Sequence, residues 1–263
     1  MQIKEIIDYL DSKYPQDLAS DFDKSIGFGI GSKNIEVKKV LLSLDLTFDV
    51  CKAAKRLGAN LIITHHPFIF NPINRIIFDT PQGQIIKFLC DNNISTYSMH
   101  TNLDAGIGGV NDTLAKMLEV DFTHEVALKD DMLVYGAIKE TTLKELVKKV
   151  KEVYKLKGVR VVGCLNKRIT SVGIIGGAGA SIYNINDCIS KNVDCFITGE
   201  VHLDKAIYAS QNDLAIIEVN HGVERFVFDS LVKDLNSKFG DIFIVSNINT
   251  DPLVNMWYKK GTY

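Results

Sequence analysis

Two adjacent histidines end a short apolar run in this chain of 263 residues. The stretch reads Leu61-Ile62-Ile63-Thr64-His65-His66-Pro67. A short apolar run that stops at a proline is typical of a buried strand. Imidazole is a common metal ligand, and α/β proteins place their ligands at strand ends. The pair His65 and His66 therefore makes a metal site our first hypothesis.

Two further groups, each a histidine with a carboxylate, follow other predicted strands. His100 and Asp104 come after a strand predicted near 95–99, and His221 and Glu224 after one near 214–219. Parallel strands joined by right-handed crossovers end on the same edge of a sheet, so these groups can converge on the histidine pair. Any one group alone is better explained by helix caps or solvated loops, but three together favour a metal site.

The types of these side chains restrict the metal chemistry. Nitrogen and carboxylate ligands without a thiolate suit Zn, Fe, Mn or Ni and do not choose between them. Five side chains with two carboxylates are more than one ion usually needs. A bridging carboxylate would hold two divalent ions about 3.5–4 Å apart, as in two-metal hydrolases. The predicted ligands are His65, His66, Asp104, His221 and Glu224.

Two other histidines have less definite interpretations. His100 could orient Asp104, act as an acid or base near the ions, or only cap a helix or pack. Of these roles, we take His100 as a candidate catalytic residue. His124 has no partner in the sequence, and we expect it to be structural.

Two later segments also carry polar groups at predicted strand ends. Residues 177–181 place two glycines and Ser181 between a strand and a helix. Such a loop can cradle a phosphate with its N–H groups, but glycines are equally the default for a tight turn. Glu200 and His202 could line the same cavity as the ligands, or belong to a surface turn with a helix cap.

The elements that position these residues alternate between strands and helices, which predicts an α/β fold. The pattern begins again near residue 121, so we expect two α/β modules with mixed, largely parallel sheets. The first, residues 1–125, would carry His65, His66 and Asp104. The second, residues 126–263, would carry His221 and Glu224, and its C-terminal segment could pack back on the first. The metal site would lie between the modules.

Composition excludes several classes of function. The chain has 46% hydrophobic residues and a net charge of −2, with no long block of like charges, so nucleic acid and membrane surfaces are not expected partners. No apolar run approaches the roughly 20 residues that span a bilayer. Residues 1–10 form an amphipathic helix pattern rather than a signal peptide. The five cysteines include no Cys-x-x-Cys, which favours free thiols and a cytoplasmic location.

Four motifs resemble the GTP cyclohydrolase 1 type 2 family, also called NIF-three-like dinuclear metal-centre proteins. They are Thr64-His65-His66-Pro67, His100-Thr101-Asn102-Leu103-Asp104-Ala105, Thr198-Gly199-Glu200, and His221 with Glu224. The resemblance implies two bridged divalent ions at the five predicted ligands, and a toroidal homohexamer with its metal sites facing an internal cavity. The family name implies opening of the imidazole ring of GTP. The sequence departs from the family at Glu224, which follows His221 by three positions rather than four.

Two functions remain open at this stage. The first is a metal-dependent hydrolase acting on a small molecule, possibly a nucleotide. The second is a non-catalytic metal-binding or metal-handling hexameric scaffold. A coordination position open to water favours the enzyme, whereas ions coordinated only by protein favour the scaffold.

Overall fold

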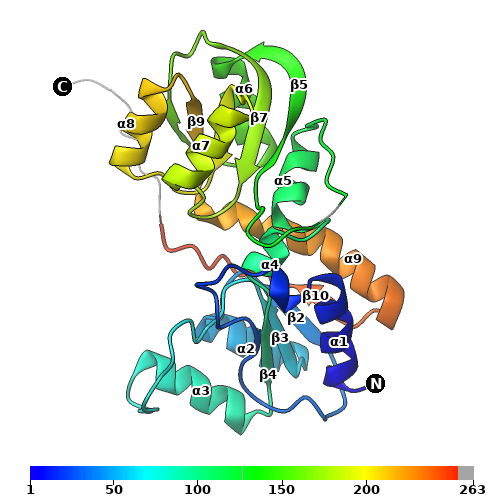
Figure 1. The fold of residues 1–263 in the computed structure, drawn as a ribbon. Coiled ribbons are helices and arrows are strands. Elements are labelled where there is room, and N and C mark those ends of the chain that lie inside the picture. Colours follow the sequence, from blue (N-terminus) through cyan, green and yellow to red (C-terminus); the bar gives the residue numbers. More distant parts are fainter. Residues whose placement is uncertain (126, 254–263) are drawn as a thin grey trace, which may run out of the picture.

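The computed structural model describes residues 1–125 and 127–253, which form two lobes (Figure 1). Each lobe is built on a five-stranded mixed sheet covered by helices. This arrangement confirms the predicted α/β class with mixed, largely parallel sheets. Among the described residues, no helix is both long and apolar enough to cross a membrane.

The first sheet has the strand order β1-β4-β3-β2-β10. Its strands are β1 (Gly27–Phe28), β2 (Val40–Ser43), β3 (Leu61–Thr64), β4 (Ser95–Ser98) and β10 (Phe243–Val245). The last four are parallel, and β1 pairs antiparallel with β4. The helical segments of this part are α1 (Ile3–Lys13), η1 (Gln16–Leu18), α2 (Phe48–Leu57), α3 (Pro81–Asp91), α4 (Thr101–Asp104) and α9 (Val227–Phe239). Strand β10, from the far end of the described chain, therefore lies beside β2.

The second sheet has the strand order β5-β7-β8-β9-β6. Its strands are β5 (Val134–Thr142), β6 (Arg160–Val162), β7 (Arg168–Ile175), β8 (Cys195–Thr198) and β9 (Ala215–Glu218). Strands β7, β8 and β9 are parallel, and the outer strands β5 and β6 run antiparallel to them. The helical segments here are α5 (Val110–Met117), α6 (Leu143–Val153), α7 (Ile182–Ser190), α8 (Leu203–Gln211) and η2 (His221–Phe226).

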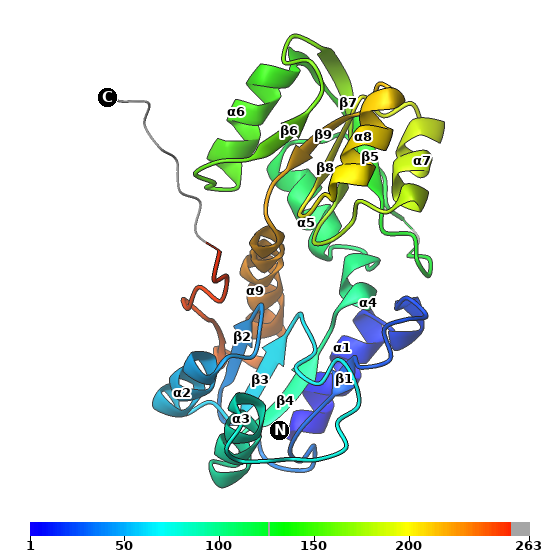
Figure 2. The same ribbon diagram turned by 90° about the vertical axis from the view of Figure 1, so that its left-hand side faces the viewer.

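The apolar strands of the first sheet are buried on both faces, because helices cover both. Side chains alternate along a strand, so neighbouring residues point to opposite faces. Leu41 and Ile62 pack towards α2 and α3, whereas Leu42 and Ile63 pack towards α1 and α9. The hydrophobic cluster that contains Leu42 and Ile63 continues through α5 and α6 to the second sheet. Helix α9 lies where the two lobes meet (Figure 2). One continuous core therefore supports both sheets.

Strand β2 is shorter than the sequence predicts. The nearly continuous apolar run at 39–46 predicts a strand of that length, but β2 ends at Ser43. Leu44 and Asp45 leave the sheet at its carboxyl edge, where the helix start at Thr47 turns the chain. Asp45 is thereby placed beside the end of the neighbouring strand β3.

Candidate metal centre

The five predicted ligands lie together, carried by segments that follow three strands. His65 and His66 directly follow β3, and Asp104 ends α4, which follows β4. His221 and Glu224 lie in η2, which follows β9 of the second sheet. One ligand atom from each of His66, His221 and Glu224 lies within 4.8 Å of the others, and the same holds for His65, Asp104 and Glu224. Glu224 belongs to both groups.

The carboxylate of Glu224 is the centre of this arrangement. Its Oε2 lies 3.1 Å from His66 Nε2, 3.3 Å from His221 Nε2 and 3.4 Å from His65 Nε2. The Nε2 atoms of His66 and His221 are 3.2 Å apart. On the other side, His65 Nε2 lies 3.7 Å from Asp104 Oδ1. Glu224 therefore lies between two pairs of donors, and its spacing of three residues from His221 keeps both side chains on one helical turn.

Two of these atoms are buried without a hydrogen-bond partner in the described part of the chain. They are His65 Nε2 and Asp104 Oδ1. A buried polar atom without a partner costs about 1–3 kcal/mol, so native proteins rarely leave one. Both atoms point at the same group of nitrogen and oxygen donors, a set that suits a divalent transition-metal ion. The residues therefore fit the metal pair that the sequence predicts.

The Nδ1 atom of each of His65, His66 and His221 contacts an oxygen atom on the side of the ring that faces away from Glu224. His65 Nδ1 lies 2.9 Å from the Met99 carbonyl oxygen, and His66 Nδ1 lies 2.6 Å from Asp45 Oδ1. His221 Nδ1 lies 2.7 Å from Glu200 Oε1. Such contacts fix the ring so that Nε2 faces inward, as second partners do for metal-binding histidines.

The close contacts of the cluster shift the pKa values of His66, His221 and Glu224. Burial lowers the pKa of His66, but the Asp45 and Glu224 carboxylates outweigh it and raise that pKa to about 10. The hydrogen bond with Glu224 is the main reason that the pKa of His221 rises to about 9. Burial would raise the pKa of Glu224, yet the surrounding histidines lower it well below its ordinary value. The raised pKa values of His66 and His221 favour protons on these two rings near neutral pH, and metal binding would displace such protons.

His100 lies at the edge of the same cluster. One ring nitrogen from each of His65, His66 and His100 lies within 4.8 Å of the others. His100 Nδ1 lies 2.8 Å from Oδ2 of Asp23, which also accepts hydrogen bonds from the backbone N–H and the hydroxyl of Thr101. The contact with Asp23 therefore orients the His100 ring. Asp104 meets His100 only through the backbone among the described hydrogen bonds, because its N–H donates to the His100 carbonyl oxygen at 3.1 Å.

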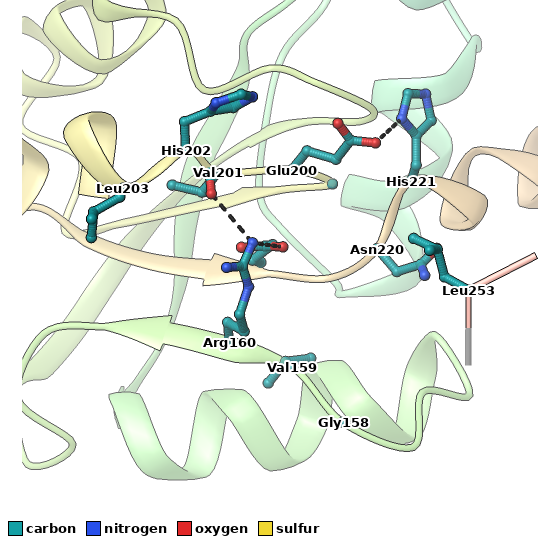
Figure 3. Close-up of a pocket in the computed structure, with 12 residues that line it drawn as sticks. Gly158, Val159, Arg160, Glu200, Val201, His202, Leu203, Asn220, His221 and Leu253 are labelled. Carbon is teal, nitrogen blue, oxygen red and sulfur yellow. Dashed lines mark hydrogen bonds and ion pairs between the residues drawn. The ribbon is translucent and has the colours of Figure 1, made fainter. Parts of the chain in front are cut away.

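The other candidate residues have different surroundings. Glu200 and His202 both line a cavity of about 690 Å³ that opens beside His221 (Figure 3). Ser181 accepts a hydrogen bond from the N–H of Asn184 and so caps α7. His124 has a partner after all, because its Nδ1 lies 2.7 Å from Asp112 Oδ1.

Sequence reasoning did not find Asp23 or Asp45. Asp45 could have been found as a polar residue near the carboxyl end of a buried strand, the position that already drew attention to His65. Asp23 lies in a polar loop, and no local pattern shows where such a side chain points.

Fold and cluster together define an α/β protein with a candidate metal centre at the ends of its parallel strands. The family model described as Duf34/NIF3 (NGG1p interacting factor 3) matches residues 1–252. The chain therefore belongs to this family, and the resemblance seen in the sequence is confirmed.

Individual relatives agree with this assignment. The chain is 31% identical over 228 residues to a GTP cyclohydrolase 1 type 2 homolog from Clostridium acetobutylicum, covering 84% of each chain. It is 29% identical over 280 residues to NGG1-interacting factor 3 from Saccharomyces cerevisiae, covering 96% of each. The crystal structure of a Bacillus cereus protein related to NIF3 matches with a TM-score of 0.88 and 26% identity, covering 97% of this chain and 99% of that one.

Proposed function

We propose that the chain binds two divalent metal ions and is a metal-dependent hydrolase. The observation that carries this proposal is the position of Glu224 Oε2, within 3.1–3.4 Å of three histidine Nε2 atoms. His66 and His221 would hold one ion, and His65 and Asp104 the other. Glu224 faces both pairs and would bridge the ions.

The surroundings of the cluster support a reaction at this site. Bound ions would polarise a substrate oxygen and lower the pKa of water. The side chain of His221 is 35% exposed and lines the cavity, so a small molecule can reach this side of the cluster. His100, held by Asp23, is our candidate for moving a proton at the cluster, because the Asp23 contact fixes Nδ1 and leaves Nε2 for that role.

A nucleotide is the first substrate to test. Relatives from Clostridium acetobutylicum and Helicobacter pylori carry the name GTP cyclohydrolase 1 type 2, with "homolog" added for the former. Metal-loaded protein incubated with GTP should release formate, and the Glu224→Gln variant should not. Turnover of phosphoesters or amides, with no formate from GTP, would support the hydrolase proposal but with a different substrate. If the metal-loaded protein turns over none of these substrates, the proposed hydrolase activity is contradicted.

A metal-binding scaffold is the second candidate. It is favoured by the burial of most of the cluster, since His65 is 0% and Glu224 3% exposed. Ions enclosed by protein contribute to folding rather than to turnover. The His66→Ala variant separates the two functions by its metal content and thermal stability. A large loss of stability, in a protein with no activity to lose, would support the scaffold.

We also propose a toroidal homohexamer in the cytoplasm. Support for self-association comes from the family resemblance and from Ile76, Ile77 and Phe78, three consecutive side chains that are each more than half exposed. Support for a reducing compartment comes from the five cysteines, which are all free thiols. Light scattering should give a mass near six times that of one 29.3 kDa chain, and a monomer would contradict the hexamer.

A further inference from the structure

The side chain of Asn111 joins the two halves of the cluster. Asn111 is 0% exposed and is the second residue of α5. Its Nδ2 donates to the carbonyl oxygens of Asp104, at 3.2 Å, and Met132, at 2.8 Å. Its Oδ1 accepts from the backbone N–H of Gly176, at 2.8 Å. Because α5 begins at Val110, Asn111 lies in its first turn, and its side-chain amide bonds other segments of the chain.

The segment that Asn111 holds on the second sheet packs directly on Glu224. A Cβ atom on Gly176 would lie 3.0 Å from Glu224 Cγ, and one on Gly177 would lie 2.5 Å from Glu224 Oε1. Gly177 also has a φ of +54°, which favours glycine. Its carbonyl oxygen accepts a hydrogen bond from the N–H of Glu200, whose carboxylate contacts His221. The backbone at 176–177 therefore fixes the space available to the Glu224 carboxylate.

We propose that Asn111 is a positioning residue that sets the separation of the Asp104 and Glu224 carboxylates. At one end it holds the backbone of Asp104, and at the other it holds the glycine segment against Glu224. Both carboxylates must face the same pair of donors for two ions to bind side by side. This inference rests on the proposed metal pair, and it identifies the residue that keeps the two carboxylates at the separation the pair needs.

The matched variants are Asn111→Ala and Asn184→Ala. Asn184 Nδ2 donates to the carbonyl oxygen of Gly179, at 2.7 Å, so it supports the same loop, and none of its described hydrogen bonds reaches the first sheet. Each protein is stripped of metal and titrated with Mn²⁺ against a chelator. Electron paramagnetic resonance of the loaded protein then reports whether two ions are magnetically coupled.

The second Mn²⁺ should bind 10–100-fold more weakly to Asn111→Ala, the range typical of lost contacts behind metal ligands. Its coupled signal should weaken, while the first ion binds within about threefold of wild type, since His66 and His221 keep their own partners. The Asn184→Ala variant should match wild type. Wild-type affinity for both ions with an unchanged coupled signal in folded Asn111→Ala would overturn the proposal.

A second pair of variants covers the case in which Asn111→Ala does not fold. Asn111→Ser replaces the amide by a shorter side chain with a single hydroxyl, and it is judged by the same criteria. Gly177→Ala adds a methyl group that displaces the Glu224 carboxylate while Asn111 stays intact. The coupled signal of this variant should also be lost. A coupled wild-type signal in either folded variant contradicts the proposal. Wild-type protein that binds no metal at all would instead refute the metal centre itself.

Discussion

Glu224 Oε2 lies 3.1 Å from His66 Nε2, although 158 positions separate the two residues in the chain. His66 follows a strand of the first sheet, and Glu224 follows the β9 strand of the second. The hydrophobic core shared by both sheets is what holds these two side chains at contact distance. The cluster is therefore a product of the whole fold, and local changes on either side should affect the same proposed metal site.

Replacing Glu224 by glutamine should remove both ions. The Glu224→Gln change keeps the size of the side chain but removes the charge that faces both donor pairs. We expect the affinity for each ion to fall by more than the ~10–100-fold that loss of a contact behind a ligand causes. Chelator competition with elemental analysis measures this. The control is Glu119→Gln, an exposed carboxylate paired with Lys149, and equal losses in the two variants would contradict a specific role for Glu224.

The Asp45→Asn change tests the contact behind His66. The amide still reaches His66 Nδ1, but it no longer offers a charged acceptor at 2.6 Å. Metal affinity should fall ~10–100-fold while the protein stays folded. Asp49→Asn is the matched control, because Asp49 lies on the exposed start of α2 and pairs only with Lys52 among the described residues. Unchanged affinity in Asp45→Asn would show that His66 does not need this partner.

The sequence was sufficient to predict the parts of the site that depend on local pattern. His65 and His66 stand out because an apolar run and a proline bracket them, and the alternation of elements predicts parallel strands ending on one edge. Asp45 was hidden because the apolar pattern extends the strand to residue 46, past its true end at Ser43. Asn111 was hidden too, because its role lies in side-chain hydrogen bonds to three other segments, which are 7, 21 and 65 positions away.

Distances within the cluster also lie beyond what sequence can give. His100 could be placed near Asp104 by spacing, but its ring is held by Asp23 from an irregular loop. The pairing of β10 with β2 depends on how α9 packs, which periodicity does not specify. Tertiary packing thus decides both which side chains meet and how they face one another.

Asp194 should make stability depend on pH far from the cluster. Burial would raise its pKa, but hydrogen bonds from Thr170 and Ser171 outweigh that and lower the pKa below 3.8. A lowered folded pKa stabilises the fold above the unfolded value near 3.9, and this stability is lost as pH falls through the folded pKa. Urea unfolding of wild type and Asp194→Asn should show a constant gap above about pH 5 that narrows towards pH 3. A gap that widens on acidification would contradict this assignment.

Tyr154→Phe separates stability from metal binding. The buried Tyr154 hydroxyl donates to the Leu114 carbonyl oxygen at 2.9 Å and so links the end of α6 to α5. That oxygen also accepts from the N–H of Leu118 and is not left without a partner. The free energy of unfolding should fall by ~0.5–1.5 kcal/mol, the usual net value of one hydrogen bond. Metal content should stay at the wild-type value, because Asn111 at the start of α5 keeps its own hydrogen bonds. A loss of metal would contradict this separation of stability from metal binding.

We propose above that the cluster holds two divalent ions with Glu224 between them. The most direct measurement is a crystal structure of metal-loaded protein with anomalous scattering recorded at the absorption edge of the metal. We expect two peaks about 3.5–4 Å apart, one beside His66 and His221 and the other beside His65 and Asp104. A single peak, or none within reach of Glu224, would contradict it.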